Sequence, residues 1–201
     1  MKSIKWKINK NFTYSLIKEN ILSLYVEAIV NPANSSLKHG GGLAKLIKDE
    51  AGGEKFQRES DDYIKKYGEV KPGSCCVTSK GNLNSIYIKH VIHAVGPIWR
   101  SGKENEPQIL KSAFESVLEE AGKLKIQSVA IPPISTGIYN FPKDLAAEIF
   151  YECINDFAKK NKFYPIQVVM SIFDDPTFSV FYKKHVEFIK TNKDSLENII
   201  M

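Results

Sequence analysis

The sequence lacks the features that would place it in a membrane or secreted class of proteins. It has no run of about 18 uninterrupted apolar residues. Its lysine-containing start, MKSIKWKINK, is followed by neither an apolar segment nor a small-residue cleavage site. We therefore expect neither a membrane span nor a secretion signal.

Cysteine is scarce, with three in 201 residues, and Cys75 and Cys76 are adjacent. This spacing suits neither a disulfide framework nor a four-ligand zinc site. We expect a reducing compartment, cytosol or nucleus, and cysteines that pack as small apolar side chains. We predict no metal and no cofactor.

The chain has no basic arm or stripe, since its 28 basic and 23 acidic residues are interleaved. The net charge of +5 supports an anionic ligand only mildly, and nucleic-acid binding as a primary role would need a denser footprint. Length and a hydrophobic content of 43% fit one domain. We predict a single domain over 1–201, with its core at about 12–190 and a polar C-terminal tail.

Short apolar runs alternate with longer helix-period segments, which predicts an α/β fold. Two early strands have no helix between them, so we expect a mixed sheet. The predicted strands are Ile4–Ile8, Phe12–Ile17, Ala28–Val30, Cys75–Thr78, Tyr87–Ala94, Ser128–Pro132 and Ile166–Phe173. The predicted helices are Leu43–Ala51, Glu54–Tyr67, Pro107–Lys123, Lys143–Lys160 and Thr177–Lys190.

Three consecutive glycines occupy the first strand-to-helix junction of interest, NPANSSLKHGGGLAKL. Glycines at a helix start let the backbone approach a ligand, and the free N–H groups with the positive dipole end favour an anion. The pattern is neither a P-loop nor a dinucleotide fingerprint. A flexible glycine-rich turn without a ligand is the alternative.

A second junction, IPPISTGIYNFP, also leads from an apolar strand through small residues into a helix. Both loops follow strand carboxyl ends, where ligands gather in open α/β sheets. Two such loops could clamp a diphosphate. The alternative is a plain connection between strand and helix.

Together these segments resemble the macrodomains, a family that binds ADP-ribose. The likeness covers about Ile17 to Lys183 and rests on IVNPAN, LKHGGGLA, HVIHAVGP, IPPISTGIYNFP and SIFDD. Through LKHGGGLA and ESDDYI the chain is most similar to coronavirus-type macrodomains and to the first macrodomains of polymerase-linked macrodomain proteins. The resemblance implies a three-layer α/β/α fold with a central sheet of six or seven strands.

The resemblance also implies the ligand contacts. Asn34 would hold the distal ribose, because an amide supplies a donor and an acceptor together. Phe173 would lie beside the adenine, unless it is an ordinary core residue at a strand end. The implied ADP-ribose-binding residues are Asn20, Ile21, Ala33, Asn34, Gly41, Gly42, Leu43, Ser135, Thr136, Gly137, Ile138, Tyr139 and Phe173.

The adenine end departs from the family pattern. Many relatives have an aspartate, which accepts a hydrogen bond from the adenine amino group, where this chain has Asn20. Without charge assistance that bond should be weaker. Asp174 could assist, or it could cap the helix that follows it.

Macrodomains include hydrolases and modules that only bind. In one hydrolase class an aspartate follows the glycine run and a hydrophobic residue, but here that position is Ala44. Coronavirus-type members also lack this carboxylate and still remove mono-ADP-ribose, with functional residues at the positions of Asn34 and His39. We predict Asn34, His39 and Gly42 as catalytic residues, with His39 supporting either the glycine loop or a proton transfer.

His90 and His93 alternate with apolar residues on a strand, and we interpret them as structural. The predicted function is hydrolysis of mono-ADP-ribose from acidic side chains of proteins. A non-catalytic ADP-ribose reader is the alternative, and an RNA or poly(ADP-ribose) scaffold is the least favoured class. The predicted partners are ADP-ribose and mono-ADP-ribosylated proteins, with no nucleic acid and no membrane, and we expect a monomer.

Overall fold

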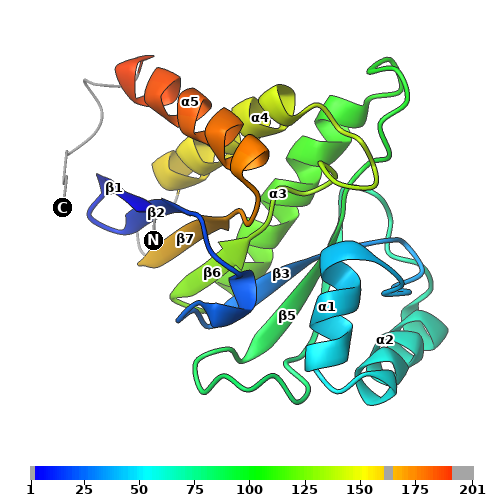
Figure 1. The fold of residues 1–201 in the computed structure, drawn as a ribbon. Helices are drawn as coiled ribbons and strands as arrows, with labels where there is room; N and C mark the ends of the chain where they lie inside the picture. The colour runs from blue at the N-terminus through cyan, green and yellow to red at the C-terminus, as the bar shows by residue number, and fades with distance from the viewer. Residues whose placement is uncertain (1–2, 161–164, 192–201) are drawn as a thin grey trace.

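The computed structural model describes residues 3–160 and 165–191, and within them seven strands form one mixed sheet (Figure 1). The sheet order is β1-β2-β7-β6-β3-β5-β4. Its strands are β1 (Ser3–Asn9), β2 (Phe12–Ile17), β3 (Ala28–Ala33), β4 (Cys75–Ser79), β5 (His90–Val95), β6 (Ser128–Ile131) and β7 (Ile166–Ser171). The four inner pairings are parallel, whereas the edge pairs β1–β2 and β4–β5 are antiparallel. The mixed sheet predicted from the early strand pair is confirmed.

Helices cover both faces of this sheet, so the predicted three layers are confirmed (Figure 1). They are α1 (Gly42–Glu50), α2 (Glu54–Tyr67), α3 (Glu106–Lys123), α4 (Lys143–Lys160) and α5 (Asp175–Thr191), with a short 3-10 helix, η1 (Ile21–Ser23). The polar tail after Thr191 lies outside the described residues. No described helix has the length and apolar character needed to cross a membrane.

The two cores follow from alternation along the central strands. Val30 and Ile92 belong to the core beneath α3, α4 and α5, whereas Ile29 and Val91 belong to the core beneath α1 and α2. Successive side chains of a strand point to opposite faces, so a continuous apolar run is what a strand covered on both sides requires.

The predicted cysteine packing is also confirmed. Cys75 and Cys76 lie on β4, and together with Cys153 they are free thiols. Burial raises the pKa of Cys75 to about 11 and that of Cys76 to about 12. Neither thiol is activated as a nucleophile.

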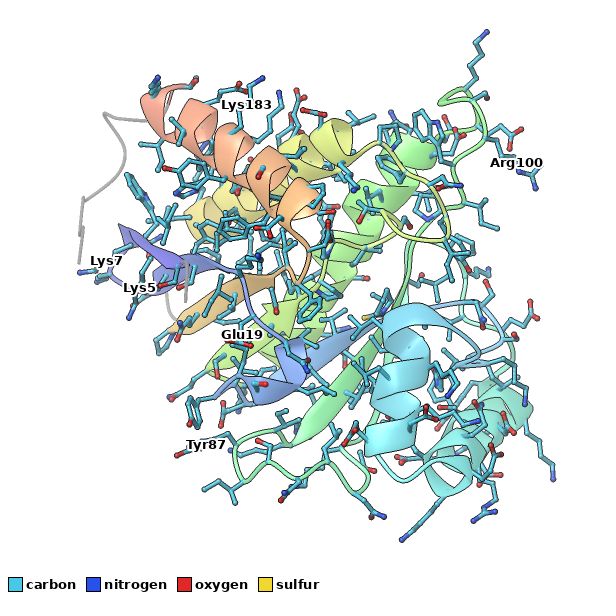
Figure 2. The ribbon with its side chains drawn as sticks, viewed as in Figure 1. Lys5, Lys7, Glu19, Tyr87, Arg100 and Lys183 are labelled. Carbon is cyan, nitrogen blue, oxygen red and sulfur yellow. The ribbon has the colours of Figure 1, made fainter. Side chains whose placement is uncertain are left out.

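Several predicted strand ends were wrong. Tyr87 lies outside β5, because Ser85 Oγ accepts hydrogen bonds from the N–H groups of Tyr87 and Ile88 in place of a sheet partner. Figure 2 shows the Tyr87 side chain pointing outward at the edge of the protein. At the carboxyl end of β7, the strand stops at Ser171 rather than Phe173.

The strand β3 runs three residues beyond the predicted end and through Pro32. It pairs with β5 along its whole length but with β6 only at Ala28 and Ile29. Beyond this point Pro32 has no N–H to donate, and β6 continues into Pro132 and Pro133. The two central strands therefore separate at their carboxyl ends, which opens a crevice at the position expected for a ligand in such a sheet.

Candidate functional site

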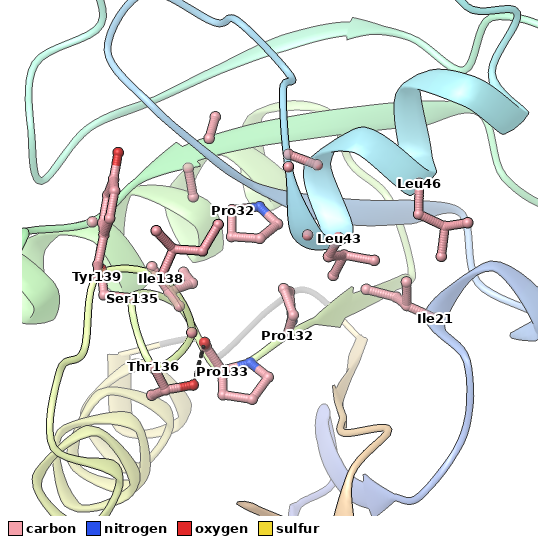
Figure 3. A pocket seen from close by; sticks show the side chains of 18 of the residues that line it. Ile21, Pro32, Leu43, Leu46, Pro132, Pro133, Ser135, Thr136, Ile138 and Tyr139 are labelled. Atoms are coloured by element: carbon pink, nitrogen blue, oxygen red, sulfur yellow. Dashed lines mark hydrogen bonds between the residues drawn. The ribbon is translucent and has the colours of Figure 1, made fainter.

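A crevice of about 910 Å³ lies across the carboxyl ends of β3, β6 and β7 (Figure 3). Four segments line it: the start of η1, the glycine loop (residues 34–42), the 135–139 loop and the end of β7. All thirteen residues predicted to contact ADP-ribose are among its lining residues. Of the three predicted catalytic residues, Asn34 and Gly42 line the crevice and His39 does not.

The glycine loop presents an uncapped helix start to the crevice. Gly42 is the first residue of α1 and has φ +55, which favours glycine. Gly41, at the N-cap, offers no side-chain cap, and the first turn holds no acidic residue. The first N–H groups of α1 are therefore free to meet an anion.

The 135–139 loop faces the glycine loop across the crevice. A Cβ placed on Gly41 would lie 3.4 Å from Ile138 Cδ1, yet 77% of the Ile138 surface remains exposed. Figure 3 shows Pro32 and Leu43 on one side and Ser135 and Ile138 on the other. Two backbone segments thus stand close enough to enclose an extended ligand between them.

The 135–139 loop holds a buried hydroxyl. Ser135 has φ +65 and is buried, and its hydroxyl has no hydrogen-bond partner within the described parts of the chain. Thr136 Oγ1 instead donates to Pro133 O at 2.9 Å, the bond drawn in Figure 3. An unpaired buried hydroxyl at the wall of a crevice is suited to a bound polar group.

At the opposite end of the crevice Phe173 is 78% exposed, so its alternative interpretation as a core residue was wrong. Asp174 caps α5, since its Oδ1 accepts from Thr177 N at 2.9 Å. The capping role considered from the sequence is therefore confirmed, although Asp174 also lines the crevice.

Asn20 and Glu19 complete this end. Asn20 Oδ1 accepts from Leu22 N at 3.0 Å and caps η1, so part of its accepting capacity is already used. Glu19 Oε1 accepts from Asn20 N at 2.9 Å, and Glu19 lines the crevice too. The carboxylate expected at position 20 in many relatives is absent there, but one is present one residue earlier.

The amide of Asn34 is largely engaged in shaping its own loop. Its Oδ1 accepts from Lys38 N at 2.9 Å and from Ser36 Oγ at 3.1 Å, and its Nδ2 donates to Lys38 O at 2.7 Å. One N–H of the amide is left over. The expected donor and acceptor pair is therefore reduced to a single available donor.

His39 belongs to the glycine loop, but its side chain is buried and is part of a polar network. Asn31 Nδ2 lies 3.1 Å from His39 Nδ1 and 2.9 Å from His93 Nδ1, and the two imidazoles stack with centroids 5.0 Å apart. Both Nδ1 atoms accept, so both Nε2 atoms donate: His39 to Ser60 Oγ at 3.0 Å and His93 to Thr78 Oγ1 at 2.8 Å. Each ring has both nitrogens occupied.

Both histidines are held neutral. Burial, with a smaller contribution from Lys48, lowers the pKa of His39 to about 4. Burial and the neighbouring His39 lower the pKa of His93 to about 3. This arrangement favours the loop-supporting interpretation of His39 over direct proton transfer, and it agrees with the structural interpretation of His93.

Known proteins resemble this chain in sequence and in fold. The Macro domain family model matches residues 30–150. A macro domain-containing protein of Caldanaerobacter subterraneus is 39% identical over 175 residues, covering 87% of this chain and 97% of that protein. An O-acetyl-ADP-ribose deacetylase of Cronobacter sakazakii is 36% identical over 169 residues, covering 84% and 91%. A match to a Thermotoga maritima protein covers 84% of this chain but only 28% of that longer protein.

Solved structures agree with the sequence matches. The Oceanobacillus iheyensis macrodomain with ADP superposes with a TM-score of 0.85 at 28% identity, covering 94% of this chain and 98% of that one. The Trypanosoma brucei macrodomain in complex with ADP-ribose gives 0.73 at 25% identity, covering 85% and 68%.

The chain belongs to the macro domain family. The relatives that establish this are bacterial and archaeal proteins, among them O-acetyl-ADP-ribose deacetylases. The expected nearness to coronavirus-type macrodomains is not shown by these similarities.

Several residues of the site were missed from the sequence. Asn31 sits in an apolar strand, where a polar residue signals a buried network, but its pairing with His39 and His93 could not be read from spacing. Glu19, Lys38 and Leu46 also line the crevice. These three residues could have been predicted because they lie within or next to the recognised motifs, and a segment that contributes one residue to a crevice wall commonly contributes its neighbours.

Proposed function

We propose that this macrodomain binds ADP-ribose in the crevice and hydrolyses an ester that joins the distal ribose to a carboxyl group. The products are ADP-ribose and the carboxylic acid. Mono-ADP-ribose on glutamate and aspartate side chains of proteins is the substrate we favour. O-acetyl-ADP-ribose, for which the Cronobacter relatives are named, is also a carboxylate ester.

The observation that carries the proposal is the pair of facing loops. Gly41 and Gly42 bring an uncapped helix start to one side of the crevice, and the 135–139 loop stands opposite. The described lining residues from Pro32 to Tyr139 in the sequence include no aspartate or glutamate. Backbone donors without competing negative charge suit a diphosphate.

The arrangement supports hydrolysis without a general base from the protein. The side chain at Ala44, on the crevice wall, is a methyl group. A carboxylate leaving group is a weak base, so an ester at the anomeric carbon can break with oxocarbenium-like character and needs no protein acid. A water oriented by the clamped substrate phosphate would then add to that carbon and pass a proton to the departed carboxylate, which gives the hemiacetal of ADP-ribose and the carboxylic acid.

Each remaining residue then has a defined task. Asn34 aligns the distal ribose through its one available N–H. His39 holds the glycine loop through Asn31 and Ser60 and does not exchange protons with the substrate, because both ring nitrogens are occupied. Gly42 lets the helix start reach the diphosphate.

The test is release of ADP-ribose from a protein automodified by mono-ADP-ribose on glutamate and aspartate, followed by mass spectrometry. Asn34→Ala should lower turnover by more than it weakens ADP-ribose binding measured by calorimetry, since ribose alignment serves the transition state. Asn84→Ala makes the same change at an exposed position outside the crevice lining and should behave as the unaltered protein. Equal losses of turnover and affinity for Asn34→Ala would contradict an alignment role.

A non-catalytic reader is the second candidate, and one observation favours it. Among the described residues that line the glycine-loop side of the crevice there is no acidic side chain, and the one basic side chain, Lys38, already pairs with Asp61 Oδ1 at 2.6 Å, so no side chain there is free to take part in proton transfer. ADP-ribose binding without release from either ester would establish the reader.

A further inference from the structure

A buried carboxylate outside the crevice gathers the backbone of a neighbouring loop. Glu106, the first residue of α3, is only 2% exposed. Its side chain accepts four backbone hydrogen bonds from the 96–105 loop. The donors are Arg100 N, Ser101 N and Gly102 N to Oε1 at 3.2, 3.1 and 3.0 Å, and Glu104 N to Oε2 at 2.6 Å.

This carboxylate stays ionised. Burial by itself raises the pKa of Glu106, but the surrounding N–H groups outweigh burial and hold the pKa at about 2. Figure 2 shows the Arg100 side chain pointing away from the protein, so the loop is tied to Glu106 through its backbone rather than its side chains. Charge-assisted bonds of this kind are the stronger class of hydrogen bond.

The same 96–105 loop packs against the 135–139 loop of the crevice. Trp99 N donates to Tyr139 O at 2.9 Å, and the Trp99 ring meets Phe141 edge to face at 4.8 Å. At the other end, a Cβ placed on Gly96 would come within 2.2 Å of Ser135 Oγ. The two loops therefore touch at both ends of the segment that faces the ligand.

The 135–139 loop makes hydrogen bonds of its own, such as Asn140 N to Gly137 O at 2.9 Å, but its backbone is strained, so external contacts help to fix its shape. Ser135 and Asn140 have φ +65 and +52, a region that non-glycine residues seldom adopt. Ile138, at its tip, is 77% exposed and so is not anchored in the core. Strained backbone of this kind persists only where the surroundings over-determine it.

We propose that Glu106 is a positioning residue for ADP-ribose. It fixes the 96–105 loop, and this loop, through Trp99, holds the 135–139 loop in the shape that binds the diphosphate. The inference rests on the proposed ADP-ribose binding and adds a residue that does not line the crevice.

The experiment compares ADP-ribose affinity by calorimetry for the unaltered protein, Glu106→Gln, Trp99→Ala and the double variant, with melting temperatures in parallel. Glu106→Gln keeps one acceptor oxygen but replaces the other by an amide N–H₂, which cannot accept the hydrogen bond from Glu104 N. We expect a roughly tenfold loss of affinity, the scale of lost preorganisation. Trp99→Ala, at a half-buried position, should give a similar loss without leaving the N–H groups around Glu106 unpaired.

The double variant distinguishes positioning from general destabilisation. If both residues act through the same loop, the double variant should bind ADP-ribose no more weakly than the single variant that has the lower affinity. Glu104→Gln removes the same charge from an exposed side chain of this loop and should leave affinity unchanged. Unchanged affinity in Glu106→Gln, or additive losses in the double variant, would overturn the proposal. Failure of the unaltered protein to bind ADP-ribose would instead overturn the proposed function.

Discussion

Acidification should destabilise this protein because three of its histidines are buried in the neutral form. His39 and His93 form the stacked pair below the glycine loop, and His185 lies on α5 against the rings of Trp6 and Tyr14. Burial lowers the pKa of His185 to about 4. Neither of its ring nitrogens has a hydrogen-bond partner among residues 3–160 and 165–191.

The sign and the magnitude follow from linkage. A histidine whose pKa is lower in the folded state costs stability once the unfolded chain starts to bind protons, so the loss begins near the unfolded value of 6.5 and grows toward the folded values of about 4, 3 and 4. At pH 5 the gap from 6.5 is about 1.5 units, or about 2 kcal/mol per histidine. Three such groups would remove about 6 kcal/mol, comparable with the whole stability of many domains.

The assay is urea unfolding followed by circular dichroism at pH 7, 6 and 5. His185→Phe keeps an aromatic ring in the cluster and removes one titrating group, so this variant should lose about 2 kcal/mol less than the unaltered protein on going to pH 5. It should also be more stable at pH 7, since two unpaired buried nitrogens are removed. The titration of carboxylates is common to both proteins and cancels in the difference.

His90→Gln is the matched control. His90 lies on the same strand as His93 but is only partly buried, so its replacement controls for the loss of a histidine side chain from this strand. The reasoning fails if His185→Phe loses as much stability between pH 7 and pH 5 as the unaltered protein.

Three further changes test the crevice itself. Ile138→Glu places a carboxylate beside the proposed diphosphate and should weaken ADP-ribose binding by about tenfold or more in calorimetry, with an unchanged melting temperature because the side chain is exposed; affinity equal to that of Ile138→Ala would contradict the clamp. Gly42→Val puts a β-branched residue at φ +55, and this strain should lower the folding stability by about 1–3 kcal/mol. Both the ADP-ribose affinity and the melting temperature should therefore fall, and full retention of both would show that the loop adapts. Ala44→Asp supplies a general base on the crevice wall and should raise ester hydrolysis about a hundredfold, the low end of such contributions; intact binding with no gain in rate would place the water elsewhere.

Much of the fold was predictable from local patterns. Apolar runs and helix-period segments predicted all seven strands and five helices that the structure describes, because both faces of the sheet are covered and every central strand must be apolar on both sides. The errors lie at strand ends such as Tyr87 and Phe173, where a serine hydroxyl or the crevice replaces a neighbouring strand.

The sequence by itself also determined which loops form the crevice. Glycines at a helix start and small residues after a buried strand need no tertiary information, since they reflect local backbone geometry. The thirteen contact residues came from the resemblance to macrodomains, and all of them line one cavity.

Only the tertiary structure decided what the polar side chains do. From the sequence, the His39 side chain could equally face the crevice or the interior. It faces the interior, because it pairs with Asn31, eight residues earlier, and stacks on His93 of another strand. The sequence does not distinguish Glu106 from other acidic residues near helix starts, and its role follows only from the 96–105 loop that folds over it. Hydrogen bonds between distant segments depend on how the elements pack, and no spacing along the chain specifies that.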